Sequence, residues 1–120
     1  MHICLMQDQE LIKGTLKTIV LQLLKQHGQM YGYEITQKVK LLTHNEVQLT
    51  EGALYPTLHK LEASGSLVTE KVHIGKRVRK YYRLTAAGER LATQKAESFA
   101  SFVQVMQGLL YPNGTEPKKP

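Results

Sequence analysis

The spacing of the apolar residues changes twice along this chain, and these changes limit the folds that it can adopt. From Ile12 to Leu24 the apolar residues recur every three or four positions, as they do along one face of an α-helix. Residues 67–84 are instead rich in valine, leucine and tyrosine around a glycine, which is typical of two strands joined by a turn. Helical spacing returns after Thr85, which can cap a further helix. The pattern therefore predicts helices, one hairpin and a closing helix.

A second, shorter helix is predicted from about Tyr33 to Thr43. Its apolar residues again follow helical spacing, and charged residues fall between them. We therefore expect three of its side chains to point inward, namely Ile35, Val39 and Leu42.

The third helix, over residues 50–64, has a clear start in the sequence. The hydroxyl of Thr50 can accept a hydrogen bond from a free N–H group of the first helical turn. The helix stops at Ser64-Gly65, because glycine readily takes the left-handed conformation that ends many helices. Pro56 lies inside the pattern and has no N–H to donate, so we expect this helix to be bent or to start late.

These elements together predict a mainly α fold of the α+β type, a winged helix-turn-helix. We assign residues 9–85 to this domain and residues 86–111 to a C-terminal dimerisation helix. Residues 112–120 are rich in proline, glycine and lysine, have nothing to bury and are expected to be disordered. In such a domain the third helix enters the major groove of DNA, and the hairpin lies along the backbone beside it.

The charge balance favours an anionic partner. The chain has 16 lysines and arginines against 10 acidic residues, which gives a net charge of +6 and a pI near 9.5. The single cysteine, Cys4, cannot form an intrachain disulfide, which is typical of a reducing compartment. No apolar stretch is long enough for a membrane span. We therefore expect a cytoplasmic protein with no membrane partner.

The basic residues gather in the hairpin, where residues 71–83 contain six of them and no acid. The six are Lys71, Lys76, Arg77, Arg79, Lys80 and Arg83. Charged side chains also protect sheet edges from aggregation, but two or three charges of either sign would do so. Six like charges repel one another, which favours contact with duplex DNA, whose charges follow about every 1.7 Å along its axis.

Strand alternation places the basic residues of the second strand on two faces. One face carries Arg77, Arg79, Tyr81 and Arg83 and is expected to be wet and positive. Lys80 lies on the other face, among Val78, Tyr82 and Leu84.

The third helix offers few side chains that could read bases. Its candidates are Thr50, Tyr55, Thr57 and Lys60. None of them is an arginine or asparagine, the residues that make paired hydrogen bonds to guanine or adenine. For each one, contact with DNA and simple exposure stay open as alternatives, and we expect the shape of the DNA to carry part of the specificity.

Five stretches of the chain form a series with a specific order and spacing. They are Gly14-Thr-Leu, Tyr31-Gly-Tyr-Glu-Ile35, Leu49-Thr-Glu-Gly-Ala-Leu-Tyr-Pro-Thr-Leu-His-Lys-Leu-Glu62, Gly75-Lys-Arg77 and Lys80-Tyr-Tyr-Arg-Leu-Thr-Ala-Ala-Gly88. This series, over about residues 11–92, resembles the PadR family of transcriptional regulators. The resemblance accounts for Pro56 and implies a homodimer that represses transcription from an inverted repeat and releases DNA when a small molecule binds. The single closing helix is similar to that of the short members.

The closing helix has a larger apolar side than a domain of this size needs for its core. The residues on that side are Phe99, Phe102, Val103, Met106 and Leu110. Their burial is worth roughly 8 to 15 kcal/mol together before the costs of association, which favours pairing with a second copy. Docking of this side on its own domain is the alternative. A small aromatic effector would bind at Phe99 and Phe102 between paired helices, although packing alone explains them equally well.

The chain lacks the common enzyme motifs, such as a glycine-rich phosphate loop, HExxH or CxxC. Its five histidines are scattered singly and give no metal-ligand spacing; they are His2, His27, His44, His59 and His73. We therefore predict no catalytic site, no metal and no cofactor. A winged helix that binds RNA or a protein partner is the alternative function, and the one-sided charge of the hairpin argues against it.

Overall fold

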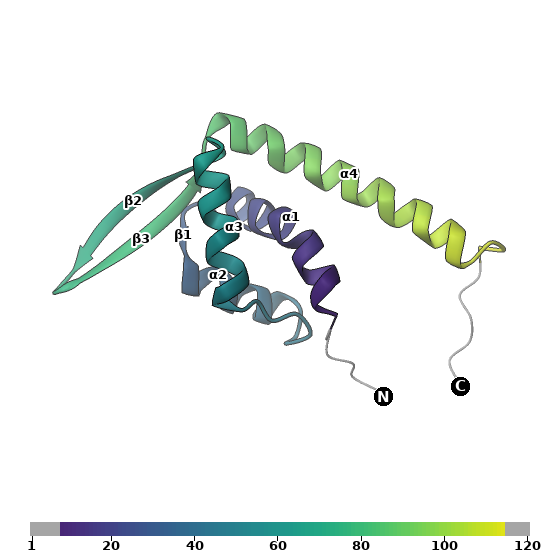
Figure 1. Ribbon diagram of the computed structural model, residues 1–120, viewed down its shortest axis with the longest axis horizontal. Helices are drawn as coiled ribbons and strands as arrows, with labels where there is room; N and C mark the ends of the chain where they lie inside the picture. Colours follow the sequence, from purple (N-terminus) through teal and green to yellow (C-terminus); the bar gives the residue numbers. More distant parts are fainter. Residues whose placement is uncertain (1–7, 115–120) are drawn as a thin grey trace.

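The computed structural model describes residues 8–114, in which four helices and three strands follow one another (Figure 1). In chain order they are α1 (Gln9–His27), β1 (Met30–Tyr31), α2 (Gly32–Leu42), α3 (Glu51–Ala63), β2 (Leu67–Ile74), β3 (Arg77–Leu84) and α4 (Ala86–Leu110). The strands form an antiparallel sheet in the order β1-β3-β2. The predicted winged helix-turn-helix with a closing helix is confirmed. His2, Cys4 and residues 115–120 of the predicted tail lie outside the described residues.

The core forms around α1. Asp8 caps this helix, because its Oδ1 accepts hydrogen bonds from the N–H groups of Glu10 and Leu11 at 3.1 and 3.2 Å. The helix ends before Gly28, which has a φ of +76°. Its buried side chains are Ile12, Leu16, Val20, Leu21, Leu23 and Leu24. They pack with buried residues of α2, α3 and the sheet, so the predicted amphipathic helix is confirmed.

Helix α2 agrees with the prediction except at its last residue. Ile35 and Val39 are buried, but Leu42 is 54% exposed, so its predicted inward position is wrong. Leu42 is the last residue of the helix and lines an apolar groove of about 470 Å³ beside α1. None of the described chain fills this groove, which explains why an apolar side chain at a core spacing is accessible to solvent.

Helix α3 begins directly after Thr50, whose Oγ1 accepts a hydrogen bond from the N–H of Ala53 at 3.2 Å. It runs without interruption to Ala63, so the expectation of a late start is wrong. Pro56 leaves the Gly52 carbonyl without its usual donor. Both residues are exposed, so water can hydrogen bond to that carbonyl and the helix tolerates the proline.

The β2–β3 hairpin (residues 67–84), which we call the wing, projects from one end of the molecule (Figure 1). Its register runs from Leu67 opposite Leu84 to Ile74 opposite Arg77, with Gly75 in the turn at a φ of +61°. The third strand, β1, was not predicted. Its two residues pair with β3 and thereby attach the base of the wing to the start of α2.

Helix α4 is fixed to the domain at its first turn and extends away from the wing (Figure 1). Thr85 caps it by accepting a hydrogen bond from the Gly88 N–H at 3.0 Å, and its hydroxyl donates to the Gly65 carbonyl at 2.6 Å. A Cβ at Gly88 would overlap the Ser66 carbonyl, so only glycine allows this close approach. The helix ends at Leu110, one residue before the predicted bound at 111, and residues 112–114 form a turn after it.

Candidate nucleic-acid interface

The exposed face of α3 differs in part from the predicted one. Thr50 and Lys60 are exposed, as expected for DNA contacts. Tyr55 is half-buried and packs at the edge of the core, where a Cβ at Gly32 would overlap its ring and hydroxyl. Thr57 is also half-buried, and its hydroxyl donates to the Ala53 carbonyl at 3.1 Å. Tyr55 and Thr57 therefore have structural contacts of their own, and their contacts with DNA stay predictions.

His59 is exposed on α3, next to Lys60, and was not among the predicted site residues. Its spacing from Pro56 and Lys60 places all three on one side of the helix. The helical period could have found it, because His59 lies three residues after the exposed Pro56 and next to the exposed Lys60.

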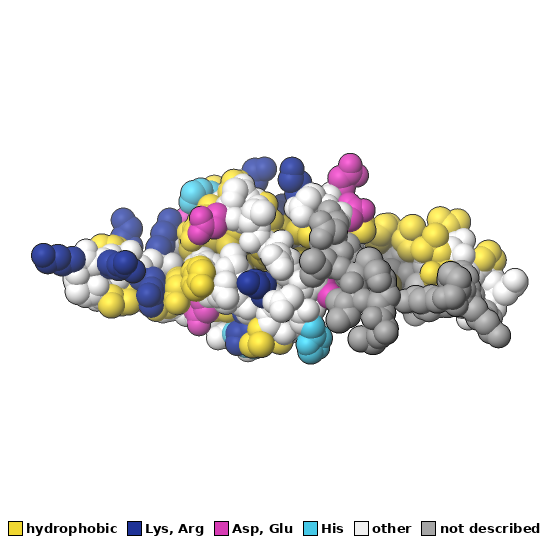
Figure 2. Space-filling view, turned by 90° about the horizontal axis from the view of Figure 1, so that it is seen from below, with side chains coloured by type: hydrophobic (Ala, Val, Ile, Leu, Met, Phe, Trp, Pro, Cys, Tyr) yellow, Lys and Arg dark blue, Asp and Glu magenta, His cyan; other side chains and the backbone are white. Residues whose placement is uncertain are grey.

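The wing carries most of the predicted basic residues into solvent. Figure 2 shows lysine and arginine side chains gathered over the wing end of the molecule. The exposed members of the predicted set are Lys71, Lys76, Arg77 and Arg83. Four cations on a hairpin of this size make a positive surface that suits a polyanion.

Lys80 is the basic residue of the wing that the structure pairs with an acid. Its Nζ lies 3.5 Å from Oε1 of Glu62 on α3, and both side chains are about one-third exposed. The hydroxyl of Thr69 donates to the other oxygen of Glu62 at 3.1 Å. Lys80 also lies directly opposite Lys71 in the hairpin, so Glu62 offsets a repulsion between like charges. Residues 71–83 contain no acid, as predicted, but Glu70 lies just before them in β2, and Glu62 of α3 reaches Lys80 from another element.

Arg79 is held at the base of the wing. Its guanidinium carbon lies 4.1 Å from the centre of the Tyr31 ring, and the rings of Tyr31 and Tyr81 meet edge to face at 5.4 Å. Hydrogen bonding with the Tyr81 side chain raises the pKa of the Arg79 guanidinium, which therefore stays charged. The face predicted to be fully wet is thus half-buried at Arg79 and Tyr81, because β1 adds Tyr31 beside them.

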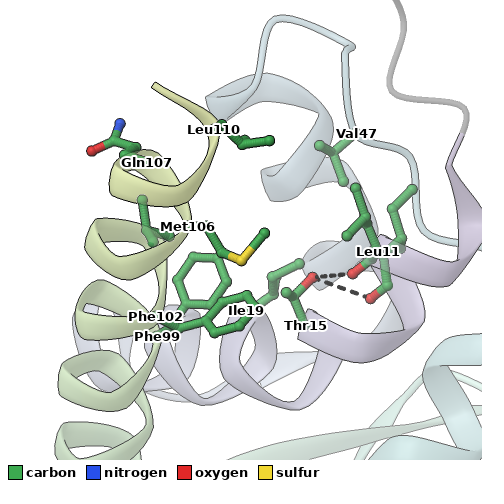
Figure 3. Close-up of a pocket in the computed structure, with 11 residues that line it drawn as sticks. Leu11, Thr15, Ile19, Val47, Phe99, Phe102, Met106, Gln107 and Leu110 are labelled. Atoms are coloured by element: carbon green, nitrogen blue, oxygen red, sulfur yellow. Dashed lines mark hydrogen bonds between the residues drawn. The ribbon is translucent and has the colours of Figure 1, made fainter. Parts of the chain in front are cut away.

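The predicted apolar side of α4 lines a groove that it shares with α1 (Figure 3). The groove has a volume of about 490 Å³ and is lined by all five predicted residues together with Leu11, Ile12, Thr15, Ile19, Val47 and Gln107. In Figure 3 Phe99, Phe102 and Met106 point across the gap toward α1. The apolar side of α4 therefore faces its own domain, which was the alternative to pairing with a second copy. It does not pack tightly against that domain, because the groove lies between them. Phe102 stays 58% exposed.

Two further exposed apolar residues on α4 were missed by the sequence reasoning. Val105 and Leu109 are 68% and 70% exposed and do not line the groove. Figure 2 shows hydrophobic side chains on α4 at the end of the molecule opposite the wing. The molecule thus has a basic end and an apolar end.

Comparison with known proteins assigns the chain to a family. The model of the PadR-like transcriptional regulator family matches residues 20–94, which is more than half of the chain. The chain belongs to the PadR family. Among residues 8–114 of this PadR-family protein, no helix is long and apolar enough to cross a lipid bilayer.

Two relatives are similar to this chain over about two thirds of its length or more. A transcriptional regulator of Mycobacterium tuberculosis is 34% identical over 81 residues, which is 68% of this chain and 73% of the relative. An uncharacterised protein of Lysinibacillus sphaericus is 31% identical over 111 residues, which is 87% of this chain and 99% of the relative.

Solved structures of transcriptional regulators have the same fold. A transcriptional regulator from Clostridium thermocellum superposes with a TM-score of 0.75 at 30% identity, over 82% of this chain and 95% of that one. A PadR family regulator from Eggerthella lenta gives a TM-score of 0.75 at 30% identity, over 88% of this chain and 89% of that one.

Proposed function

We propose that this protein is a dimeric repressor that binds an inverted repeat in duplex DNA and is released by a small-molecule effector. The observation that carries the proposal is the position of the basic wing beside the exposed face of α3. A groove-entering helix next to a basic hairpin is the arrangement by which winged helices bind DNA. Because duplex DNA is the proposed partner, we place the protein in the cytoplasm.

Most of the binding energy in this proposal comes from phosphates. Lys76, Arg77 and Arg83 are exposed on the wing and can each contact one phosphate. On α3, Lys60 and His59 are exposed, and Thr50 lies at the start of the helix. Few of these side chains make paired hydrogen bonds to a base edge, so the shape of the DNA contributes to the choice of sequence.

The apolar end of the molecule supports the proposed dimer. The groove beside α4 continues past Phe99 into the groove of about 470 Å³ between α1 and the end of α2, since Thr15, Ile19, Val47 and Phe99 line both. Such a surface is costly to expose to water, and the described chain has no segment left to cover it. A second copy brings the matching apolar helix, and two-fold symmetry then presents two wings to two half-sites.

The same groove is the proposed effector site. Its lining is almost entirely apolar and aromatic, with Thr15 and Gln107 as the polar side chains. A volume of about 490 Å³ suits a small aromatic molecule, and the second copy would enclose it further. Filling this space changes how α4 packs, which is how such a ligand would alter DNA binding.

Selection of bound duplexes from a random pool tests the function directly. We expect an enriched inverted repeat with half-site centres about one helical turn apart. Gel shifts with the selected duplex, its single strands and an RNA duplex of the same sequence test the class of nucleic acid. Binding that prefers RNA, or no enrichment at low ionic strength, would favour the alternative of an RNA-binding or protein-binding winged helix.

A further inference from the structure

A third hollow lies between the base of the wing and α3, and we call it the wing-base pocket. Its volume is about 370 Å³. Tyr33 of α2, Tyr55 and His59 of α3, and Arg79, Lys80 and Tyr82 of β3 contribute to its lining. Tyr31 of β1 lines it too, so the pocket is built where β1, α2, α3 and β3 meet.

Apart from Val78, the side chains around the wing-base pocket are cations and hydrogen-bond donors. Lys80 and Arg79 supply positive charge, and no carboxylate is among its lining residues. The two nearby acids have partners of their own, because Glu62 contacts Lys80 and Thr69, and Glu34 accepts a hydrogen bond from the Tyr31 N–H at 3.3 Å. Burial raises the pKa of Tyr82, so its hydroxyl keeps the proton that it can donate. Such a lining favours an anion.

The position of the pocket identifies the source of the anion. When a helix enters the major groove and the adjacent hairpin lies on the backbone, one DNA strand must pass between the two elements. The wing-base pocket occupies that gap, with His59 on the helix side and Lys80 on the wing side. The group of DNA that reaches a pocket there is a phosphate with its neighbouring sugars.

We propose that the wing-base pocket seats one backbone phosphate of bound DNA per protomer, with His59 and Lys80 as its contacts. This inference rests on the proposed function, because it takes duplex DNA as the partner. It adds His59 as a phosphate contact on α3. It also means that the Glu62 carboxylate competes with the DNA phosphate for Lys80. In this arrangement Lys80 exchanges a carboxylate for a phosphate when DNA binds.

The test uses the selected operator with single methylphosphonates, each of which replaces one charged phosphate oxygen by a methyl group. We expect one position in each half-site at which this change weakens binding of the natural protein about tenfold, the loss of one charge-assisted hydrogen bond. In Lys80→Met and in His59→Ala the same substitution should cost less than about threefold, because the contact is already absent. Lys17→Met and His27→Ala alter exposed residues of α1 and should keep the full penalty.

A further variant tests the exchange of partners at Lys80. Glu62→Gln keeps a hydrogen-bond acceptor for Thr69 and removes the negative charge beside Lys80. It should tighten binding to the operator by up to about fivefold, the worth of an exposed ion pair, and this gain should vanish at the coupled methylphosphonate position. Unchanged or weaker binding in Glu62→Gln would contradict the exchange.

Three results distinguish the ways in which the inference could fail. If the natural protein binds no duplex, the proposed function fails. If it binds the operator and every methylphosphonate penalty is the same in Lys80→Met and His59→Ala, only the pocket assignment fails. The last experiment titrates inorganic phosphate into the DNA-free protein and follows the His59 ring signals by NMR. Saturation at submillimolar phosphate would assign the pocket to a free phosphorylated molecule and overturn the proposal.

Discussion

Phe102 offers the sharpest test of the proposed dimer. It is 58% exposed in the single chain and lines the groove between α1 and α4. Complete burial of a phenylalanine is worth roughly 1.5 to 3 kcal/mol, so covering the exposed part contributes about 0.9 to 1.7 kcal/mol. Both copies lose this burial in Phe102→Asp. We therefore expect self-association to weaken by about 2 to 3.5 kcal/mol, or roughly 30- to 300-fold in the dissociation constant, before the cost of the new carboxylate is added.

The assay is sedimentation equilibrium over a range of protein concentrations, with operator affinity measured on the same samples. Phe102→Asp should move the protein to the monomer and weaken operator binding, because each monomer holds one half-site. Gln104→Asp places the same charge on the same helix, at an exposed position that does not line the groove. It should leave the mass unchanged. An undiminished dimer in Phe102→Asp, or equal dissociation in both variants, would refute pairing through this side of α4.

Three other predictions follow from the contacts described above. Arg77→Ala combined with Arg79→Ala should weaken binding to all DNA sequences alike and reduce the slope of log affinity against log salt by about 2 to 4, since the dimer loses two to four phosphate contacts; an altered base preference at the same slope would contradict a phosphate role. Gly32→Ala should lower the free energy of unfolding by about 1 to 3 kcal/mol in urea titrations, because its Cβ would overlap Tyr55. Adding Tyr55→Leu should restore part of that loss, and no recovery would show that the overlap is not the cause. Finally, burial raises the pKa of Tyr82 above its ordinary value of 10.0, so the folded state holds this proton more tightly than the unfolded chain. The stability from this group is complete below pH 10 and should fall as the pH rises above it, with a smaller fall in Tyr82→Phe in thermal melts.

The elements that the sequence predicted well are those with long periodic patterns or clear caps. The buried face of α1 and the cap residues Thr50 and Thr85 fall as expected. Each of these features depends on residues within a few positions of one another. Local chemistry therefore sufficed for the helices and the hairpin.

The features that the sequence did not predict depend on contacts between distant segments. Strand β1 has two residues and no period of its own, so only its pairing with β3 defines it. The stacking of Arg79 on Tyr31 and the pairing of Lys80 with Glu62 join different elements, so counting charges along the hairpin overstated how free these cations are. Leu42 followed the helical spacing of a core residue, but its burial depends on a partner surface that this chain does not supply.

The attachment of α4 at one end only has a mechanical consequence. The helix is held through residue 93 by the cap at Thr85, by the close contact of Gly88 with Ser66, and by hydrogen bonds from Gln22 to the Ala92 carbonyl and from Lys25 to Thr93. The residues from 94 to Leu110 then make a rod of about 25 Å. A tilt of about 5° of this free part displaces its far end by about 2 Å. If two such rods cross in the dimer, a small ligand beneath them would change the separation of the two α3 helices by a few ångströms, which shifts them relative to half-sites one helical turn apart.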